Sequence, residues 1–65
     1  MLTEQIGINA GLVWNALQNG ALASKAIKKL TKLNEKDLQL ALGWLAREGK
    51  ISLTETESEV LISLV

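Results

Sequence analysis

The chain has 65 residues, enough for one domain with one small hydrophobic core, and 48% of the residues are hydrophobic. It contains no proline, no cysteine and no histidine. The absence of cysteine and histidine excludes disulfide bridges and the usual zinc ligands. Seven basic and seven acidic residues balance to a formal net charge of zero. We therefore expect residues 1–65 to form a single domain that holds no metal or cofactor.

The balanced charge hides an uneven distribution along the chain. All seven basic residues lie between Lys25 and Lys50, where only three acidic residues oppose them, so this segment carries a net charge of +4. The remaining four acidic residues are Glu4, Glu55, Glu57 and Glu59. Such a polarised chain is expected to present one basic surface and one acidic surface.

No apolar run approaches the length of about 18 residues that a bilayer-spanning helix needs. The N-terminus also lacks a basic segment followed by an apolar one, the pattern of a secretory signal. Together these patterns predict a soluble, cytoplasmic protein without a membrane partner.

The first predicted element is a helix that ends at Asn19 and Gly20, a typical helix stop. Its start is open, because Thr3 offers an early cap and Asn9 a later one. Gly7 and Gly11 each cost about 1 kcal/mol relative to alanine inside a helix, which favours a helix over 9–19. In the longer alternative, the two glycines would leave a groove for another backbone. The apolar residues with helical spacing are Ile6, Ala10, Val13, Trp14 and Leu17.

Residues 20–23 are expected to form a turn and one short extended segment, followed by a second helix over 24–31. Within and just after this helix the polar and apolar residues separate onto two faces. The residues expected to point inward are Ala26, Ile27, Leu30 and Leu33, and the outward row is Lys25, Lys28, Lys29 and Lys32.

The third helix has both ends marked. Asn34 is a good N-cap, Asp37 completes a capping box in its aspartate form, and Gly49 provides the left-handed residue that ends a helix. We therefore predict a helix over 35–48. Its core stripe is Leu38, Ala41, Leu42 and Leu45, and its opposite face carries Lys36, Gln39, Leu40, Gly43 and Arg47.

The hydrophobic period changes to two after the third helix. Ile51 and Leu53 alternate with polar residues, which predicts a half-buried strand over 50–54, and 55–58 is polar enough for a hairpin loop. Residues 59–65 form a strand that is apolar on both faces. A chain this short cannot cover both faces, so self-association is expected there.

This order of elements resembles a winged helix-turn-helix domain, an α+β fold that is mainly α, with a three-helix core and a C-terminal β-hairpin wing. The resemblance rests on IGINAGLVWNAL, on ASKAIKKLTKLNEKDLQLALGWLAREGKI and on the hairpin that follows. The whole chain is similar to a family of short, free-standing winged helix-turn-helix proteins of Bacteroides-type bacteria. That family is largely uncharacterised, and the resemblance implies a DNA-binding, dimeric protein.

The resemblance also implies which residues contact DNA, because the second helix of the motif lies in the major groove and the preceding helix crosses the phosphate backbone. The groove-facing residues would be Lys36, Gln39, Gly43 and Arg47, and the phosphate contacts would come from Lys25, Lys28, Lys29 and Lys32. Gln39 can read adenine and Arg47 can read guanine. A homodimeric transcriptional regulator bound to double-stranded DNA is the function that follows.

Three features of the sequence oppose DNA binding. The hairpin that would be the wing carries acidic residues, which repel phosphates. Leu40 occupies the middle of the expected reading face, although a leucine can contact a thymine methyl group. Glu35 and Asp37 place negative charge at the start of the third helix, where they also suit the helix dipole.

The alternative function is a protein-interaction or dimerisation module that does not bind nucleic acid. The chain has more apolar residues than one small core needs, and we expect a homodimer in either case. Trp14 and Trp44 are expected in the core, because large aromatic side chains dominate small cores. The residues expected at the dimer interface are Ile8, Leu12, Leu61 and Val65.

Catalysis is not expected. The chain has no histidine or cysteine, no glycine-rich phosphate loop and no serine in a nucleophile-elbow context. The glutamates at 55, 57 and 59 lie in the expected hairpin without the glycine and spacing of a calcium loop. No small-molecule ligand is indicated.

Overall fold

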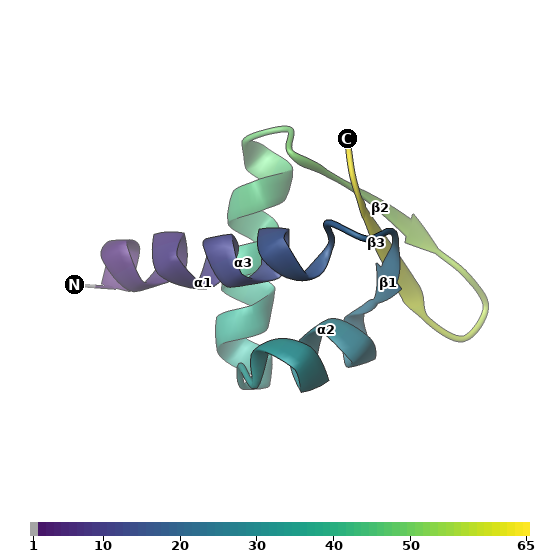
Figure 1. Ribbon diagram of the computed structural model, residues 1–65, viewed down its shortest axis with the longest axis horizontal. Coiled ribbons are helices and arrows are strands. Elements are labelled where there is room, and N and C mark those ends of the chain that lie inside the picture. Colours follow the sequence, from purple (N-terminus) through teal and green to yellow (C-terminus); the bar gives the residue numbers. More distant parts are fainter. Residues whose placement is uncertain (1) are drawn as a thin grey trace.

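Three helices pack together and a β-hairpin projects from them (Figure 1). The computed structural model describes residues 2–65, so Met1 of the predicted domain lies outside the described residues. This arrangement confirms the winged helix-turn-helix expectation. The elements in chain order are α1 (Leu2–Ala16), β1 (Leu22–Ala23), α2 (Ser24–Thr31), α3 (Glu35–Arg47), β2 (Ile51–Glu55) and β3 (Val60–Leu64).

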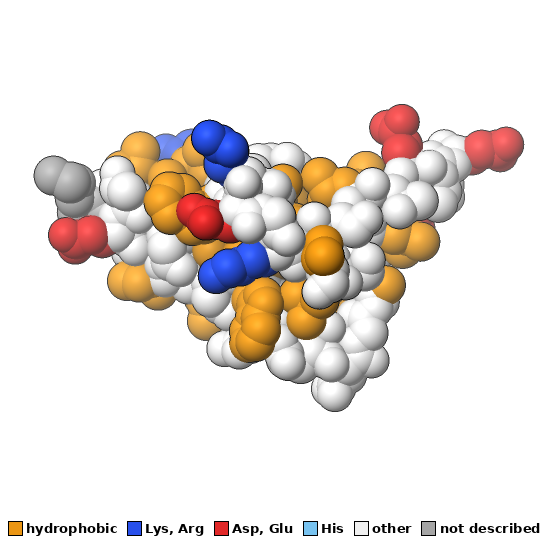
Figure 2. Space-filling model, turned by 90° about the horizontal axis from the view of Figure 1, so that it is seen from above, with side chains coloured by type: hydrophobic (Ala, Val, Ile, Leu, Met, Phe, Trp, Pro, Cys, Tyr) orange, Lys and Arg blue, Asp and Glu red, His pale blue; other side chains and the backbone are white. Residues whose placement is uncertain are grey.

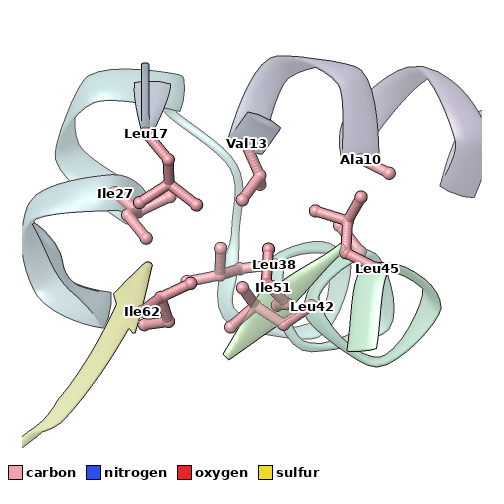
Figure 3. Close-up of a cluster of buried hydrophobic side chains, with 10 residues drawn as sticks. Ala10, Val13, Leu17, Ile27, Leu38, Leu42, Leu45, Ile51 and Ile62 are labelled. Atoms are coloured by element: carbon pink, nitrogen blue, oxygen red, sulfur yellow. The ribbon is translucent and has the colours of Figure 1, made fainter. Parts of the chain in front are cut away.

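One hydrophobic core joins the three helices to the hairpin (Figure 3). Side chains from α1, α2, α3, β2 and β3 converge there, and the predicted core stripe of α3 is wholly buried. Burial of these side chains supplies most of the stability of so small a domain. The buried hydrophobic residues are Ala10, Val13, Leu17, Ile27, Leu38, Ala41, Leu42, Leu45, Ile51 and Ile62.

The sheet is antiparallel with the strand order β1-β3-β2, so β3 is the central strand. Ile62 of β3 lies opposite Leu22 of β1 and Leu53 of β2. The two-residue β1 confirms the short extended segment expected at 20–23, and β2 and β3 confirm the predicted hairpin to within one residue. The hairpin closes where the Thr56 amide donates to the Glu59 carbonyl at 2.8 Å.

The first helix begins earlier than predicted. It starts at Leu2 instead of residue 9 and ends at Ala16, after which 17–19 form a turn. Asn9 is therefore not a cap: it is buried in mid-helix, where its Oδ1 accepts from Gln5 Nε2 at 3.0 Å. The helix continues through both glycines because Ile6 is partly buried and Ala10 is buried, so packing anchors this stretch.

Three predictions about burial were wrong. Leu30, expected to point inward, is 65% exposed, and both Trp14 and Trp44, expected in the core, are 42% exposed. Leu30 lies in the last turn of α2, whereas the packing of α2 on its neighbours is centred on Ile27. The two tryptophans lie at the flanks of the buried stripes of α1 and α3, where a large ring stays partly at the surface.

A turn of three residues joins α2 to α3. Lys32 ends α2 in the left-handed conformation, with φ of 61°, and its amide donates to the Lys28 carbonyl at 2.8 Å. Asn34 then caps α3 as predicted, because its Oδ1 accepts from the Asp37 amide at 2.8 Å. Gly49, with φ of 71°, ends α3 as expected. This turn fixes the position of α3 relative to α2.

Candidate nucleic-acid interface

The face of α3 that points away from the core is open to solvent. Lys36, Gln39, Gly43 and Arg47 are all exposed, as the sequence predicted for the groove-facing residues. Leu40, on the same face, is 36% exposed. The structure therefore brings together one amide, two cations, one apolar side chain and one bare backbone position on one side of a single helix.

The lysine row of α2 adjoins the same end of the molecule. Lys25, Lys28, Lys29 and Lys32 are all exposed, and the short turn after Lys32 brings this row next to the start of α3. The exposed lysines agree with the predicted polar face of α2. Three of these lysines lie on α2 and Lys32 follows at its C-cap, so four exposed ammonium groups can contact phosphate oxygens without disturbing the core.

Glu35 joins the two helices at this surface. Its Oε2 pairs with Lys28 Nζ at 3.2 Å, and its Oε1 accepts from Gln39 Nε2 at 3.0 Å. The hydrogen bond from Gln39 and the neighbouring Lys28 ammonium lower the pKa of the Glu35 carboxyl below its ordinary value. In this state Glu35 engages the Lys28 ammonium and the Gln39 amide, two groups that contacts with DNA would need.

A shallow groove runs between α3 and the sheet. Its cavity volume is about 290 Å³, and Gly43 forms part of its wall on α3. A Cβ atom at Gly43 would meet no atom within 4 Å, so the fold does not require glycine there. The groove is lined by Ser24, Gln39, Leu42, Gly43, Leu53 and Val60.

The wing is acidic at its tip. Glu55, Glu57 and Glu59 are all exposed on the hairpin, and Figure 2 shows acidic side chains at the projecting end, away from the basic groups on the body of the molecule. Carboxylates at this position repel phosphate. The lysine row and the wing therefore have opposite electrostatic preferences for DNA.

The residues expected at a dimer interface are divided between two regions. Ile8 and Leu12 are 61% and 43% exposed on α1, and Val65 is 85% exposed at the C-terminus. Leu61 is half-buried on β3, opposite Ala23 of β1 and Thr54 of β2. At Leu61 the central strand therefore has a neighbour on each side.

Two features of this surface were not predicted from the sequence. The first is the set of contacts around Glu35. Its contact with Gln39 is an i, i+4 pair within α3, which the sequence spacing could have revealed. Its contact with Lys28 crosses the turn between α2 and α3, and the spacing could not reveal it. Leu53 is 50% exposed beside the α3 groove, although strand alternation places it on the core side. No sequence signal distinguishes Leu53 from the buried Ile51.

Two further findings concern the whole of the described chain. Within residues 2–65, no three His, Cys, Asp or Glu side chains are grouped so that they could hold a metal ion. In the same part of the chain, no helix is both long and apolar enough to cross a membrane.

Comparison with known proteins agrees with this geometry. A family model described as "Winged helix-turn-helix domain (DUF2582)" matches residues 1–64. The chain is 32% identical over 63 residues to the uncharacterized protein MJ1608 of Methanocaldococcus jannaschii, covering 92% of this chain and 90% of that protein. It also resembles the solution NMR structure of protein BT2368 from Bacteroides thetaiotaomicron, with a TM-score of 0.87 and 31% identity, over 98% of this chain and 79% of that one.

Proposed function

Since this chain belongs to the winged helix-turn-helix family DUF2582, we propose that it binds double-stranded DNA through α2 and α3. The observation that carries the proposal is the exposed, uncovered face of α3 with a row of four exposed lysines beside it. In this fold the helix at the position of α3 enters the major groove and the preceding helix crosses the backbone. The lysines of α2 then hold phosphates, and α3 contacts the bases.

Each group on α3 suits one kind of contact. The Gln39 amide can pair with adenine, the Arg47 guanidinium can pair with guanine, and Leu40 can contact a thymine methyl group. Gly43, which has no side chain and open space in front of it, lets the helix backbone approach the base edges closely. These few contacts supply the sequence preference, and the lysines supply most of the affinity.

Glu35 restrains this surface in the free protein. Its carboxylate holds Lys28 and Gln39, so both must leave it before they contact DNA. Replacing Glu35 by glutamine removes a negative charge from the interface and frees the Lys28 ammonium. We expect this substitution to tighten DNA binding, whereas a carboxylate that only supports the fold would leave the affinity unchanged.

The wing contributes no phosphate contact in this proposal. Its three exposed glutamates favour an orientation in which the hairpin tip stays in solvent or faces away from the DNA backbone. Binding therefore depends on α2 and α3 more than in winged helices with a basic hairpin. Substitutions at the tip that remove charge are expected to raise the affinity modestly and uniformly across DNA sequences.

The fuller proposal is a homodimeric transcriptional regulator of the cytoplasm. Two copies related by a two-fold axis would present two α3 helices to successive turns of one face of the duplex. Pairing two modest sites on one DNA raises the overall affinity well above that of either site alone. This gain suits a domain that offers few base contacts of its own.

The direct experiment measures binding of a fluorescent mixed-sequence duplex by anisotropy at several salt concentrations. Replacing Lys28, Lys29 and Arg47 together by alanine is expected to weaken binding. It should also lower the slope of log K against log salt by roughly 1.8, at about 0.9 for each of the two phosphate-contacting lysines. Lys50→Ala is the control, on a duplex that holds one copy only, because Lys50 lies beside Trp44 instead of on the exposed face of α3. If the triple variant binds DNA as tightly as the wild type, the assignment of these three residues as DNA contacts is refuted.

A second candidate function is a protein-interaction module on the same fold. It is favoured by the exposed large hydrophobic residues, among them Ile8 and Leu30 at 61% and 65% exposure. A module of this kind would show no salt-dependent DNA binding at any concentration tested. The anisotropy titration therefore separates the two functions.

A further inference from the structure

A groove between α1 and α3 is lined mainly by glycine and apolar side chains, unlike the basic face of α2 and α3. Two half-exposed tryptophans, Trp14 and Trp44, stand on its two sides, and its volume is about 340 Å³. We infer that a second copy of this chain packs into this groove with its own α1, an inference that rests on the homodimer proposed above. The groove is lined by Gly7, Ala10, Gly11, Trp14, Trp44, Leu45 and Lys50.

The charge distribution favours a second copy as the partner. A two-fold interface places the same surface on both sides, so a charged patch would face its own like charges. The face of α2 is basic and the hairpin tip is acidic, and each would repel itself. Among the 15 residues of α1, Glu4 alone is charged, and Lys50 is the one charged residue that lines the groove. Two copies therefore meet there with less repulsion than on α2 or at the hairpin tip.

The composition of the exposed part of α1 is that of an interface core. Leu2 is 59% exposed, Ile8 is 61% exposed, and Trp14 adds an aromatic ring at the edge of the groove. Interface cores are enriched in aromatic side chains and depleted of charge in the same way. The first turns of α1 also project beyond α3, where a partner can reach them (Figure 1).

The accessible surface of the chain leaves room for such a contact. It measures 4534 Å², whereas a folded monomer of 7.0 kDa is expected to expose about 4,000 Å². The excess is roughly 500 Å², a large part of the 800 Å² or so that each partner buries in an interface of standard size. Packing α1 and the groove against a second copy would bury surface of that order.

The glycines of α1 fit the same contact. A Cβ atom at Gly7 or Gly11 would meet nothing within 4 Å, so the described fold does not require glycine at either position. Each nevertheless costs about 1 kcal/mol relative to alanine in a helix. Bare backbone on the wall of the groove allows a partner helix to approach more closely than side chains would.

This interface revises the contact expected from the sequence. Ile8 and Leu12 are exposed on α1 but do not line the groove. Leu61 is not part of it, because β3 contributes no residue to the lining of the groove. The α1–α3 groove replaces the last strand as the main contact.

The test compares Gly7→Ala/Gly11→Ala with Gly43→Ala by sedimentation equilibrium from about 10 μM to about 1 mM, which spans weak self-association. All three sites are helical glycines with open space around them, so every variant keeps the fold. We expect a wild-type dimer, a dissociation constant raised at least about tenfold by the double substitution, and no change with Gly43→Ala. The chain has no tyrosine or phenylalanine, so its emission comes from Trp14 and Trp44 alone and should shift to the red as dimers dissociate.

A wild-type chain that stays monomeric at about 1 mM overturns the inference, because the groove would then serve a different molecule. A double variant that dimerises as tightly as the wild type overturns the groove as the contact. DNA binding is measured separately on a duplex that holds one copy only. A wild-type chain that binds this duplex but does not dimerise would refute the interface and leave the DNA surface standing. A wild-type dimer that does not bind the duplex would refute the DNA surface alone.

Discussion

Replacing Lys32 by glycine is expected to stabilise the fold and weaken DNA binding at the same time. Within residues 2–65, Lys32 is the only residue other than glycine with a positive φ, at 61°. Its ammonium group makes no hydrogen bond or ion pair with the described part of the chain. The side chain therefore contributes charge to the proposed DNA surface, while its backbone conformation costs stability.

The magnitude follows from two opposing terms. An ordinary L-residue in the left-handed conformation costs roughly 1–2 kcal/mol, and glycine gives back roughly 0.5–1 kcal/mol through its greater freedom in the unfolded chain. The net gain is about 0.5–1 kcal/mol in the free energy of unfolding. For a domain of this size that corresponds to a rise of roughly 2–8 °C in Tm.

Thermal unfolding followed by circular dichroism at 222 nm measures the gain, at a concentration where self-association is absent. Lys32→Ala is the matched control, because it removes the same charge and keeps a side chain in the left-handed conformation. Both variants should lose about 0.9 from the salt slope of DNA binding, but only the glycine variant should gain stability. Equal Tm values for the two variants would refute the backbone argument.

Three further predictions concern the cap, the core and the Glu35 carboxyl. Asn34→Ala should lower the free energy of unfolding by about 1 kcal/mol in urea titrations, because the Asp37 amide loses its acceptor. Ile62→Ala removes a fully buried side chain and should cost about 2–5 kcal/mol, enough to leave much of the chain unfolded by the same measurement. An NMR pH titration should place the pKa of Glu35 below the ordinary value of a glutamate carboxyl, and Gln39→Ala should raise it. Because folding lowers the pKa of Glu35, its ionised carboxylate stabilises the folded state. This contribution is fully present above the unfolded-state pKa and is lost as the pH falls through the folded-state pKa.

The sequence predicted the elements that carry strong local signals. The ends of α3 were predicted because Asn34 and Gly49 act through their own backbone and side-chain chemistry, and both do so in the structure. The hairpin was predicted because its hydrophobic period is two. The exposed face of α3 follows from its core stripe, since four buried residues on one side fix the orientation of the rest.

The features that the sequence did not predict correctly all depend on tertiary packing. Whether α1 starts at Leu2 or at Asn9 depends on the contacts of Ile6 and Ala10, which outweigh the cost of two glycines. The exposure of Leu30 depends on where α2 meets its neighbours, and helical spacing does not contain that information. The same limit applies to the Lys28–Glu35 pair, because it spans a turn whose geometry is set by the unusual conformation at Lys32.

The basic face of α2 and α3 and the open α1–α3 groove are the two surfaces to which we propose separate tasks. Basic and amide groups on α2 and α3 suit DNA, whereas the nearly uncharged α1 suits a second copy. Because the two surfaces share few residues, substitutions on one should leave the other intact. This separation lets the DNA-binding claim be tested without first resolving the state of association.

The measurement that tests the central claim most directly is an NMR titration of isotope-labelled protein with a mixed-sequence DNA duplex. It is run at low salt and again at about physiological salt, where exposed charges are screened beyond roughly 8 Å. We expect shifts confined to residues 25–47, from α2 and α3, that shrink as salt is added. An unchanged spectrum at low salt would contradict DNA binding and leave the lysine row of α2 as a solvated surface.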